Sequence, residues 1–275
     1  MSVLSKAGLP ACLVSLLLVP LALAQKPVRQ APAPADWAAL AKLPDFTGVW
    51  EMGLGGPPRT GAAGGRGAAP VGRGAGRGGA APAGPSLTPA YAAKAQAEAQ
   101  NQKAEDNQTA NCLPPGLPAI MSQPYPLEFL LTPGQVTIIS EAYTQVRHIY
   151  TDGRLLPEDP DPTFYGTSVG HWEDGTLVVE SIGFAPVPRG LSFPNSDKMK
   201  VLERFRLTDP DTMMIETTII DPEALTKPYG MPARTLKRHR SWTLAEYICE
   251  ENNRNFVDEK GKAGINLANP NAAPR

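Results

Sequence analysis

The sequence predicts an all-β protein, a single antiparallel up-and-down barrel of about nine strands with a short N-terminal helix and one surface helix. From residue 127 onward, short stretches of alternating apolar and polar residues are separated by turn residues. Three pairs of these stretches flank Pro133-Gly134, Asp174-Gly175 and Asp209-Pro210-Asp211, which are typical hairpin connections. With 42% hydrophobic residues the chain can build one core, and a net charge of −1 argues against a nucleic-acid partner.

The first 24 residues predict a secretory signal peptide. Lys6 precedes an apolar stretch that is short and interrupted by proline, and Ala22-Leu23-Ala24 matches a signal-peptidase site. We therefore expect cleavage after Ala24, a periplasmic or secreted protein, and no integral membrane segment in the mature chain.

Next come segments of different composition. Residues 25–35 form a Pro/Ala tether, and Asp36 can cap a helix from Trp37 to Lys42 that leads into a strand over 46–52. Residues 53–86 are a Gly/Pro/Arg-rich insertion, which we expect to be disordered because it can bury little apolar surface. Thr88-Pro89 is a helix start within the predicted surface helix 87–108.

Residues 36–52 and 109–255 are thus predicted to form one barrel domain, followed by a flexible tail, 256–275. Beyond the first strand, we expect strands at 127–132, 135–141, 145–151, 166–173, 176–184, 199–208, 212–220 and 236–244.

Two cysteines, Cys112 and Cys249, remain after signal removal. In an oxidising compartment they most simply form one disulfide. Neither has a second cysteine or a histidine at metal-ligand spacing, so we do not expect a metal site there.

The helix followed by Gly48-Val49-Trp50 resembles the opening motif of lipocalins and related calycin barrels. The resemblance covers about residues 36–52 and 125–250, and Tyr150-Thr151-Asp152-Gly153-Arg154 is similar to a second calycin motif. It implies that Trp50 seals one end of the barrel and that Arg238 or Arg240, from the last strand, packs over the indole.

Several stretches also resemble a group of exported bacterial proteins. They are Cys112-Leu113-Pro114-Pro115-Gly116, residues 143–154, Gly170-His171-Trp172-Glu173, Leu177-Val178-Val179-Glu180 and Val201-Leu202-Glu203-Arg204-Phe205. This resemblance implies that the protein is exported and forms one domain. It implies no catalytic or binding function.

Glu203 is the most informative polar residue. It lies between Val201 and Phe205 on the apolar face of its strand, so the carboxylate needs a partner inside the barrel. One interpretation is a ligand-facing acid or general base; the other is a salt bridge to Arg238 or Arg240.

The remaining polar candidates give weaker signals. Glu180 could pair with Glu203 in acid–base chemistry, and His171 could contribute to the same cavity. His148, His171 and His239 lack the spacing of a zinc site, so we expect no metal and no cofactor. Five residues are candidates for a ligand site in the barrel: Tyr150, His148, Trp172, Phe205 and Arg238.

These observations favour an exported, non-enzymatic barrel that binds a small, mostly apolar molecule. Two alternatives remain. One is a lyase, isomerase or hydrolase that uses Glu203 with a cavity histidine or arginine. The other is a structural or envelope interaction protein, whose barrel would be filled by side chains.

Overall fold

The computed structural model describes residues 31–53, 84–101, 108, 111–185, 191 and 193–249, and the backbone of 255–257 and 263–265. The predicted signal peptide, most of the tether, nearly all of the Gly/Pro/Arg-rich insertion and most of the predicted tail lie outside the described residues. The elements below belong to the compact unit Ala33–Arg275.

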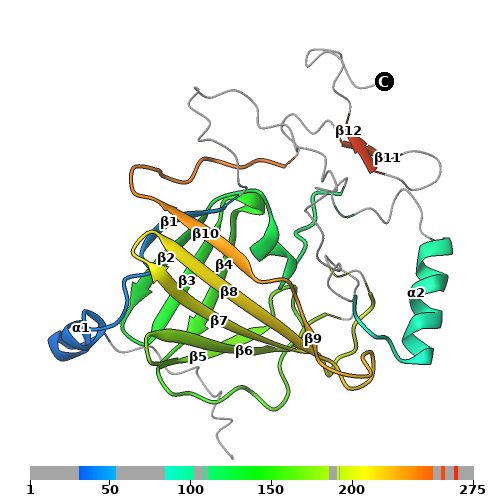
Figure 1. Ribbon diagram of the computed structural model, residues 1–275, viewed down its shortest axis with the longest axis horizontal. Coiled ribbons are helices and arrows are strands. Elements are labelled where there is room, and N and C mark those ends of the chain that lie inside the picture. The colour runs from blue at the N-terminus through cyan, green and yellow to red at the C-terminus, as the bar shows by residue number, and fades with distance from the viewer. Residues whose placement is uncertain are drawn as a thin grey trace, which may run out of the picture. The chain divides into compact units, whose positions relative to one another are not determined.

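The main sheet closes into the predicted barrel (Figure 1). Its order is β1 to β8 and then β10, and closure follows because β10 pairs with both β8 and β1. Nine strands form the closed ring. They are β1 (Gly48–Met52), β2 (Leu127–Thr132), β3 (Gln135–Ser140), β4 (Gln145–Tyr150), β5 (Thr167–Glu173), β6 (Thr176–Ile182), β7 (Lys200–Asp209), β8 (Thr212–Ile220) and β10 (Arg234–His239).

The barrel differs from the prediction at one pair of strands. All other neighbours in the ring are antiparallel, but β4 and β5 are parallel. Parallel pairing requires a crossover, and residues 151–166 return the chain to the end of the barrel where β4 began. The purely antiparallel prediction is therefore wrong at this position, where the connection is too long for a hairpin.

Turn chemistry accounts for the hairpins that were predicted correctly. Gly134 connects β2 and β3 with a φ of 73°, and Asp174-Gly175 connects β5 and β6 with φ values of 45° and 78°. Both turns need the left-handed backbone region that Gly and Asp tolerate. The predicted range of the last strand, 236–244, lies too far toward the C-terminus, because β10 begins at Arg234 and ends at His239.

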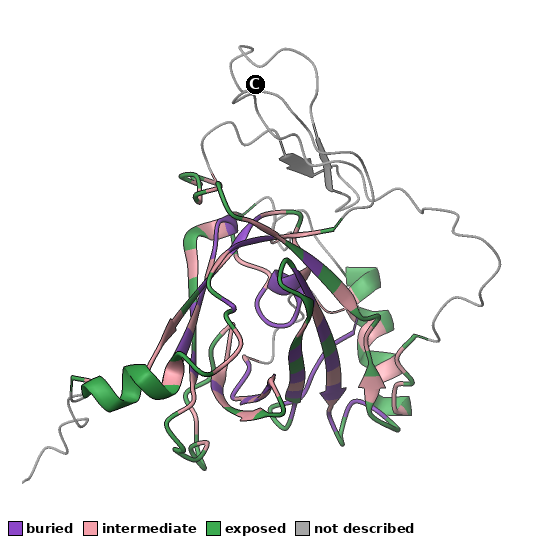
Figure 2. Cartoon of the chain, turned by 60° about the vertical axis from the view of Figure 1, so that its left-hand side comes forward, coloured by how far each residue is buried: buried purple, intermediate pink, exposed green. Residues whose placement is uncertain are grey.

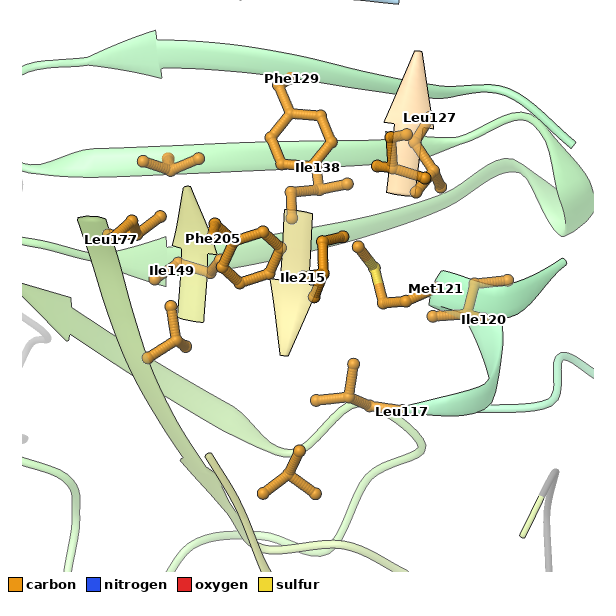
Figure 3. Close-up of a cluster of buried hydrophobic side chains, with 14 of the residues drawn as sticks. Leu117, Ile120, Met121, Leu127, Phe129, Ile138, Ile149, Leu177, Phe205 and Ile215 are labelled. Carbon is orange, nitrogen blue, oxygen red and sulfur yellow. The ribbon is translucent and has the colours of Figure 1, made fainter. Parts of the chain in front are cut away.

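Side chains fill the barrel interior. Trp50 is fully buried. So are Phe129, Phe205 and Ile215, and Met121 from the short helix η2 (Ala119–Ser122) joins them in the core (Figure 3). Along the strands, buried positions alternate with exposed ones (Figure 2). The core therefore occupies the space that a central ligand cavity would need.

The helices and minor strands lie outside the ring of nine. Helix α1 (Pro34–Leu40) starts earlier than expected, and Asp36 Oδ2 accepts a hydrogen bond from the Ala33 N–H at 2.8 Å. Helix α2 (Pro89–Asn101) has no buried residue, as expected for a surface helix. The other elements are η3 (Ala142–Thr144), β9 (Tyr229–Gly230) and an antiparallel pair in the predicted tail region, β11 (Asn255–Val257) and β12 (Ala263–Ile265).

None of the helices in the described part of the chain has the length and apolar character needed to cross a bilayer.

Candidate functional site

A buried polar network connects four consecutive strands of the barrel. Arg147 on β4 donates from Nη2 to Glu203 Oε2 on β7 at 2.5 Å and to Ser181 Oγ on β6 at 3.2 Å. Its Nε donates to Ser168 Oγ on β5 at 3.4 Å, and the two serine hydroxyls are 2.7 Å apart. The network thus bridges the parallel β4–β5 pair from the inside.

Alternation along β4 and β7 places this ion pair inside the barrel. Arg147 and Ile149 are buried on β4, while Val201, Glu203 and Phe205 are buried on β7. The side chain of Glu203 has no exposed surface, and that of Arg147 is 4% exposed. The inward orientation of Glu203 predicted from the sequence is confirmed.

The predicted salt-bridge partner of Glu203 was wrong. Arg238 lies at the opposite end of the barrel, with its guanidinium carbon 4.5 Å from the centroid of the Trp50 ring and Nη1 3.0 Å from Asp45 Oδ2. Arg240 pairs with Asp211 instead, at 2.7 Å between Nη2 and Oδ1. The arginine-over-tryptophan contact expected from the calycin resemblance is present, formed by Arg238.

The hydrogen bonds of this region are incomplete. Among the described residues, Arg147 Nη1, Glu203 Oε1, Tyr165 Oη and Thr217 Oγ1 are buried polar atoms without a hydrogen-bond partner. Thr217 is the cross-strand neighbour of Glu203. Buried polar groups are nearly always paired, so their concentration at one end of a barrel indicates a polar site.

A pocket opens at the parallel seam, the line where β4 meets β5. These strands pair only through Ile149–Ser168 and Tyr150–Val169, so among the described strands the backbone of residues 145–148 pairs with β3 alone. The resulting gap is a solvent-open pocket of about 270 Å³, hereafter the seam pocket. Its lining includes Val146, Arg147, His148, Tyr150, Tyr165 and Ser168.

The seam pocket combines an aromatic outer wall with a polar floor. Tyr150 stacks with His148, and the guanidinium carbon of Arg154 lies 3.8 Å from the Tyr150 ring centroid. His148 Nδ1 is 3.0 Å from Gln135 Nε2, which fixes the imidazole on the outer face of β4. Burial raises the pKa of the Tyr165 phenol, so this group stays protonated and can donate a hydrogen bond.

The other predicted site residues lie away from the pocket. Phe205 is fully buried in the core, and Trp172 packs against Phe46 with ring centroids 5.0 Å apart. Arg238 belongs to the Trp50 end. Of the predicted ligand-site residues, the structure therefore brings only Tyr150 and His148 into the seam pocket.

The predicted acid–base candidates are separated as well. His171 is 63% exposed and its Nε2 is 2.8 Å from Glu173 Oε1. Glu180 accepts from Lys200 Nζ at 2.8 Å on the outer surface, whereas Glu203 points inward. Glu203, Glu180 and His171 do not share a cavity.

Sequence reasoning missed Arg147, Ser168 and Ser181. The alternation Arg147–Ile149 was visible, but it competed with the alternation of Val146, His148 and Tyr150 on the other face. The two serines gave no signal, because their contact with Arg147 depends on the pairing of four strands.

The predicted disulfide between Cys112 and Cys249 is confirmed, with Cα atoms 5.6 Å apart. No group of three or more potential metal-ligating side chains occurs within the described ranges.

Comparison with known proteins adds no identity: no protein-family model matches the chain, and no curated protein is similar to it in sequence.

Proposed function

We propose that this protein is an exported barrel that binds a small, mostly apolar molecule in the seam pocket. The observation that carries the proposal is the lining of that pocket, which joins an apolar and aromatic outer wall to a buried arginine. Thr163, Gly166 and Thr167 complete the lining, so the pocket joins apolar and aromatic surface to several polar groups, a combination that small-molecule sites use.

The seam is a better ligand site than the barrel centre. The centre is occupied by the core, whereas the seam is a break in the sheet where backbone and side chains leave space. Val146 and the rings of Tyr150 and Tyr165 offer surface for an apolar body. The volume of about 270 Å³ is slightly below that of typical drug-sized pockets and suits a compact molecule.

Export is part of the proposal. It rests on the N-terminal signal pattern and on the pairing of Cys112 with Cys249, since structural disulfides persist mainly in oxidising compartments.

The experiment is native mass spectrometry of the protein purified from its export compartment, with analysis of the small molecules released on denaturation. Val146→Trp should fill the pocket mouth. Leu130→Trp places the same side chain at an exposed apolar position on β2, outside the pocket. We expect one bound molecule in wild type and in Leu130→Trp, and its loss in Val146→Trp.

The filled interior also favours a second candidate, a structural or envelope interaction protein. Wild-type protein that carries no small molecule, or equal loading of Val146→Trp and wild type, would argue for that candidate and against the seam pocket as a binding site.

A further inference from the structure

We infer that the small, mostly apolar molecule of the seam pocket is a short peptide in extended conformation, bound through its main chain to the open edge of β4. This inference rests on the proposed function and names the ligand class of the same site.

The first step is the direction of the main-chain groups on β4. The Thr151 N–H donates to the carbonyl of Gly134, just before β3, at 2.9 Å. Successive residues of a strand direct their N–H and C=O groups to opposite sides, so those of Val146 and His148 point away from β3 and across the seam. Because β4 and β5 pair only from Ile149 onward, the N–H groups of Val146 and His148 and the Val146 carbonyl have no strand partner among the described residues.

The second step is that the opposite wall of the seam is held away from this edge. The Thr163 N–H donates to the Gly183 carbonyl at 3.0 Å, and the Ala185 N–H donates to the Thr163 carbonyl at 2.9 Å. Gly166 has a φ of 63° and lies so close to the Ile182 carbonyl that a Cβ would have no room. The chain that leads into β5 is therefore bonded on the β6 side, and the gap beside β4 is built into the fold.

The third step is the occupant that such a gap suits. An open strand edge recognises another extended chain, which supplies the missing main-chain donors and acceptors. At about 3.3 Å per residue, positions 145–148 span about 13 Å, which suits a peptide of about three residues. The join of Ile149 to Ser168 closes one end of the gap, so the peptide must be short. Val146 and Tyr150 line the opening and favour apolar side chains.

Two probes test the inference on the mature protein. One is a tripeptide of valine, alanine and valine, acetylated and amidated so that it carries no charge. The other is the same peptide with all three residues N-methylated, which removes their main-chain donors and keeps the side chains. Dissociation constants are measured at pH 7 by ligand-observed NMR. Wild type should bind the first peptide about tenfold or more tightly, a ratio that corresponds to the loss of one or two hydrogen bonds.

Amide hydrogen exchange reads the geometry directly. In the free protein, the N–H groups of Arg147 and Ile149 should exchange slowly because they face β3, and those of Val146 and His148 should exchange fast. Saturation with the first peptide should slow exchange at Val146 and His148 by about tenfold or more and leave Arg147 unchanged. A ligand held by side chains alone would not produce this alternation.

One variant removes a donor from the open edge. Val146→Pro lacks the N–H that faces the seam but leaves the β3 ladder intact, which is the position where a strand tolerates proline. Val146→Ala is the matched control, because it shortens the side chain and keeps the N–H. Val146→Pro should weaken binding of the first peptide about tenfold or more, and Val146→Ala should weaken it less. If Val146→Pro fails to fold, the exchange pattern and the N-methylated peptide still decide.

The outcomes distinguish the inference from the proposed function. No binding of the first peptide, equal binding of the two peptides, or fast exchange at Val146 and His148 in the complex would overturn the ligand class. A non-peptide molecule recovered from wild type and lost in Val146→Trp would also overturn it, while the seam pocket stands. Binding of the first peptide that Val146→Trp leaves intact would overturn the seam pocket itself.

Discussion

The guanidinium of Arg147 and the carboxylate of Glu203 form an ion pair inside the barrel, with Nη2 and Oε2 2.5 Å apart. The pair connects β4 to β7 across two intervening strands, with Ser168 and Ser181 completing the bridge. It spans the short parallel contact between β4 and β5, which has only two residue pairs. The network thus stabilises the weakest join of the barrel, and two of its members, Arg147 and Ser168, also line the seam pocket.

Glu203→Gln should destabilise the fold by about 3–5 kcal/mol, because Arg147 would be left buried without its counter-charge. Urea denaturation measures the effect.

Glu180→Gln is the matched control: it breaks the exposed pair with Lys200 on neighbouring strands and should cost less than about 1 kcal/mol. Replacing both partners, as in Arg147→Met with Glu203→Leu, should recover much of the loss. Equal stability of Glu203→Gln and wild type would show that the pair does not hold the seam.

The bond between Cys112 and Cys249 closes a loop with a sequence separation of 137 residues. Thiol titration of the unfolded, unreduced mature protein should find no free thiol. Replacing both cysteines by serine should lower stability by up to about 4–5 kcal/mol, the chain-entropy value for a loop of this length. Two titratable thiols in the exported protein would contradict the structure.

Arg238→Met should destabilise the protein by about 1–3 kcal/mol, since it removes the cation–π contact with Trp50 and a charge-assisted hydrogen bond to Asp45. Arg240→Met is the control, because this arginine is 62% exposed and pairs at the surface with Asp211. The two are compared by thermal unfolding and by tryptophan fluorescence. A similar small effect of both changes would mean that Arg238 does not help to close its end of the barrel.

Acid should weaken the contact at Asp45. Burial alone would raise the pKa of this carboxyl, but hydrogen bonds from Thr47 and from the Arg238 guanidinium outweigh burial and hold the pKa below its ordinary value of 3.8. A group with a lowered folded pKa stabilises the protein above its unfolded value and loses that contribution as pH falls through the folded value. The contribution is therefore present at neutral pH and is lost below about pH 4.

Carboxyl-detected NMR can follow the titration of Asp45 directly. The midpoint should lie below 3.8 in wild type and move upward in Arg238→Met, which removes one of the causes. An unchanged midpoint would show that Arg238 does not act on this carboxyl.

Local patterns were sufficient to predict much of the barrel. The alternation of Val201, Glu203 and Phe205 oriented β7, and Asp174-Gly175 identified a hairpin, because both signals depend on neighbouring residues alone. Closure of the sheet and the interior position of Glu203 followed from these signals.

The ion-pair partner and the pocket depend on long-range pairing. Arg147 lies 56 residues from Glu203, and the two meet only because β5 runs parallel to β4 after a long connection. The same parallel join creates the gap beside residues 145–148. No local pattern indicates the direction of β5. The sequence analysis therefore predicted arginines of the last strand, rather than Arg147, as the salt-bridge partner of Glu203.

The central claim is that a small molecule occupies the seam pocket. The most direct test is amide NMR of ¹⁵N-labelled protein that has been unfolded and refolded to remove any ligand, then titrated with the molecule recovered from wild type. Shift changes should concentrate at residues 146–150 and 165–168, which line the pocket or adjoin its lining. No change, or changes centred on Trp50 and Arg238 at the opposite end of the barrel, would contradict the claim.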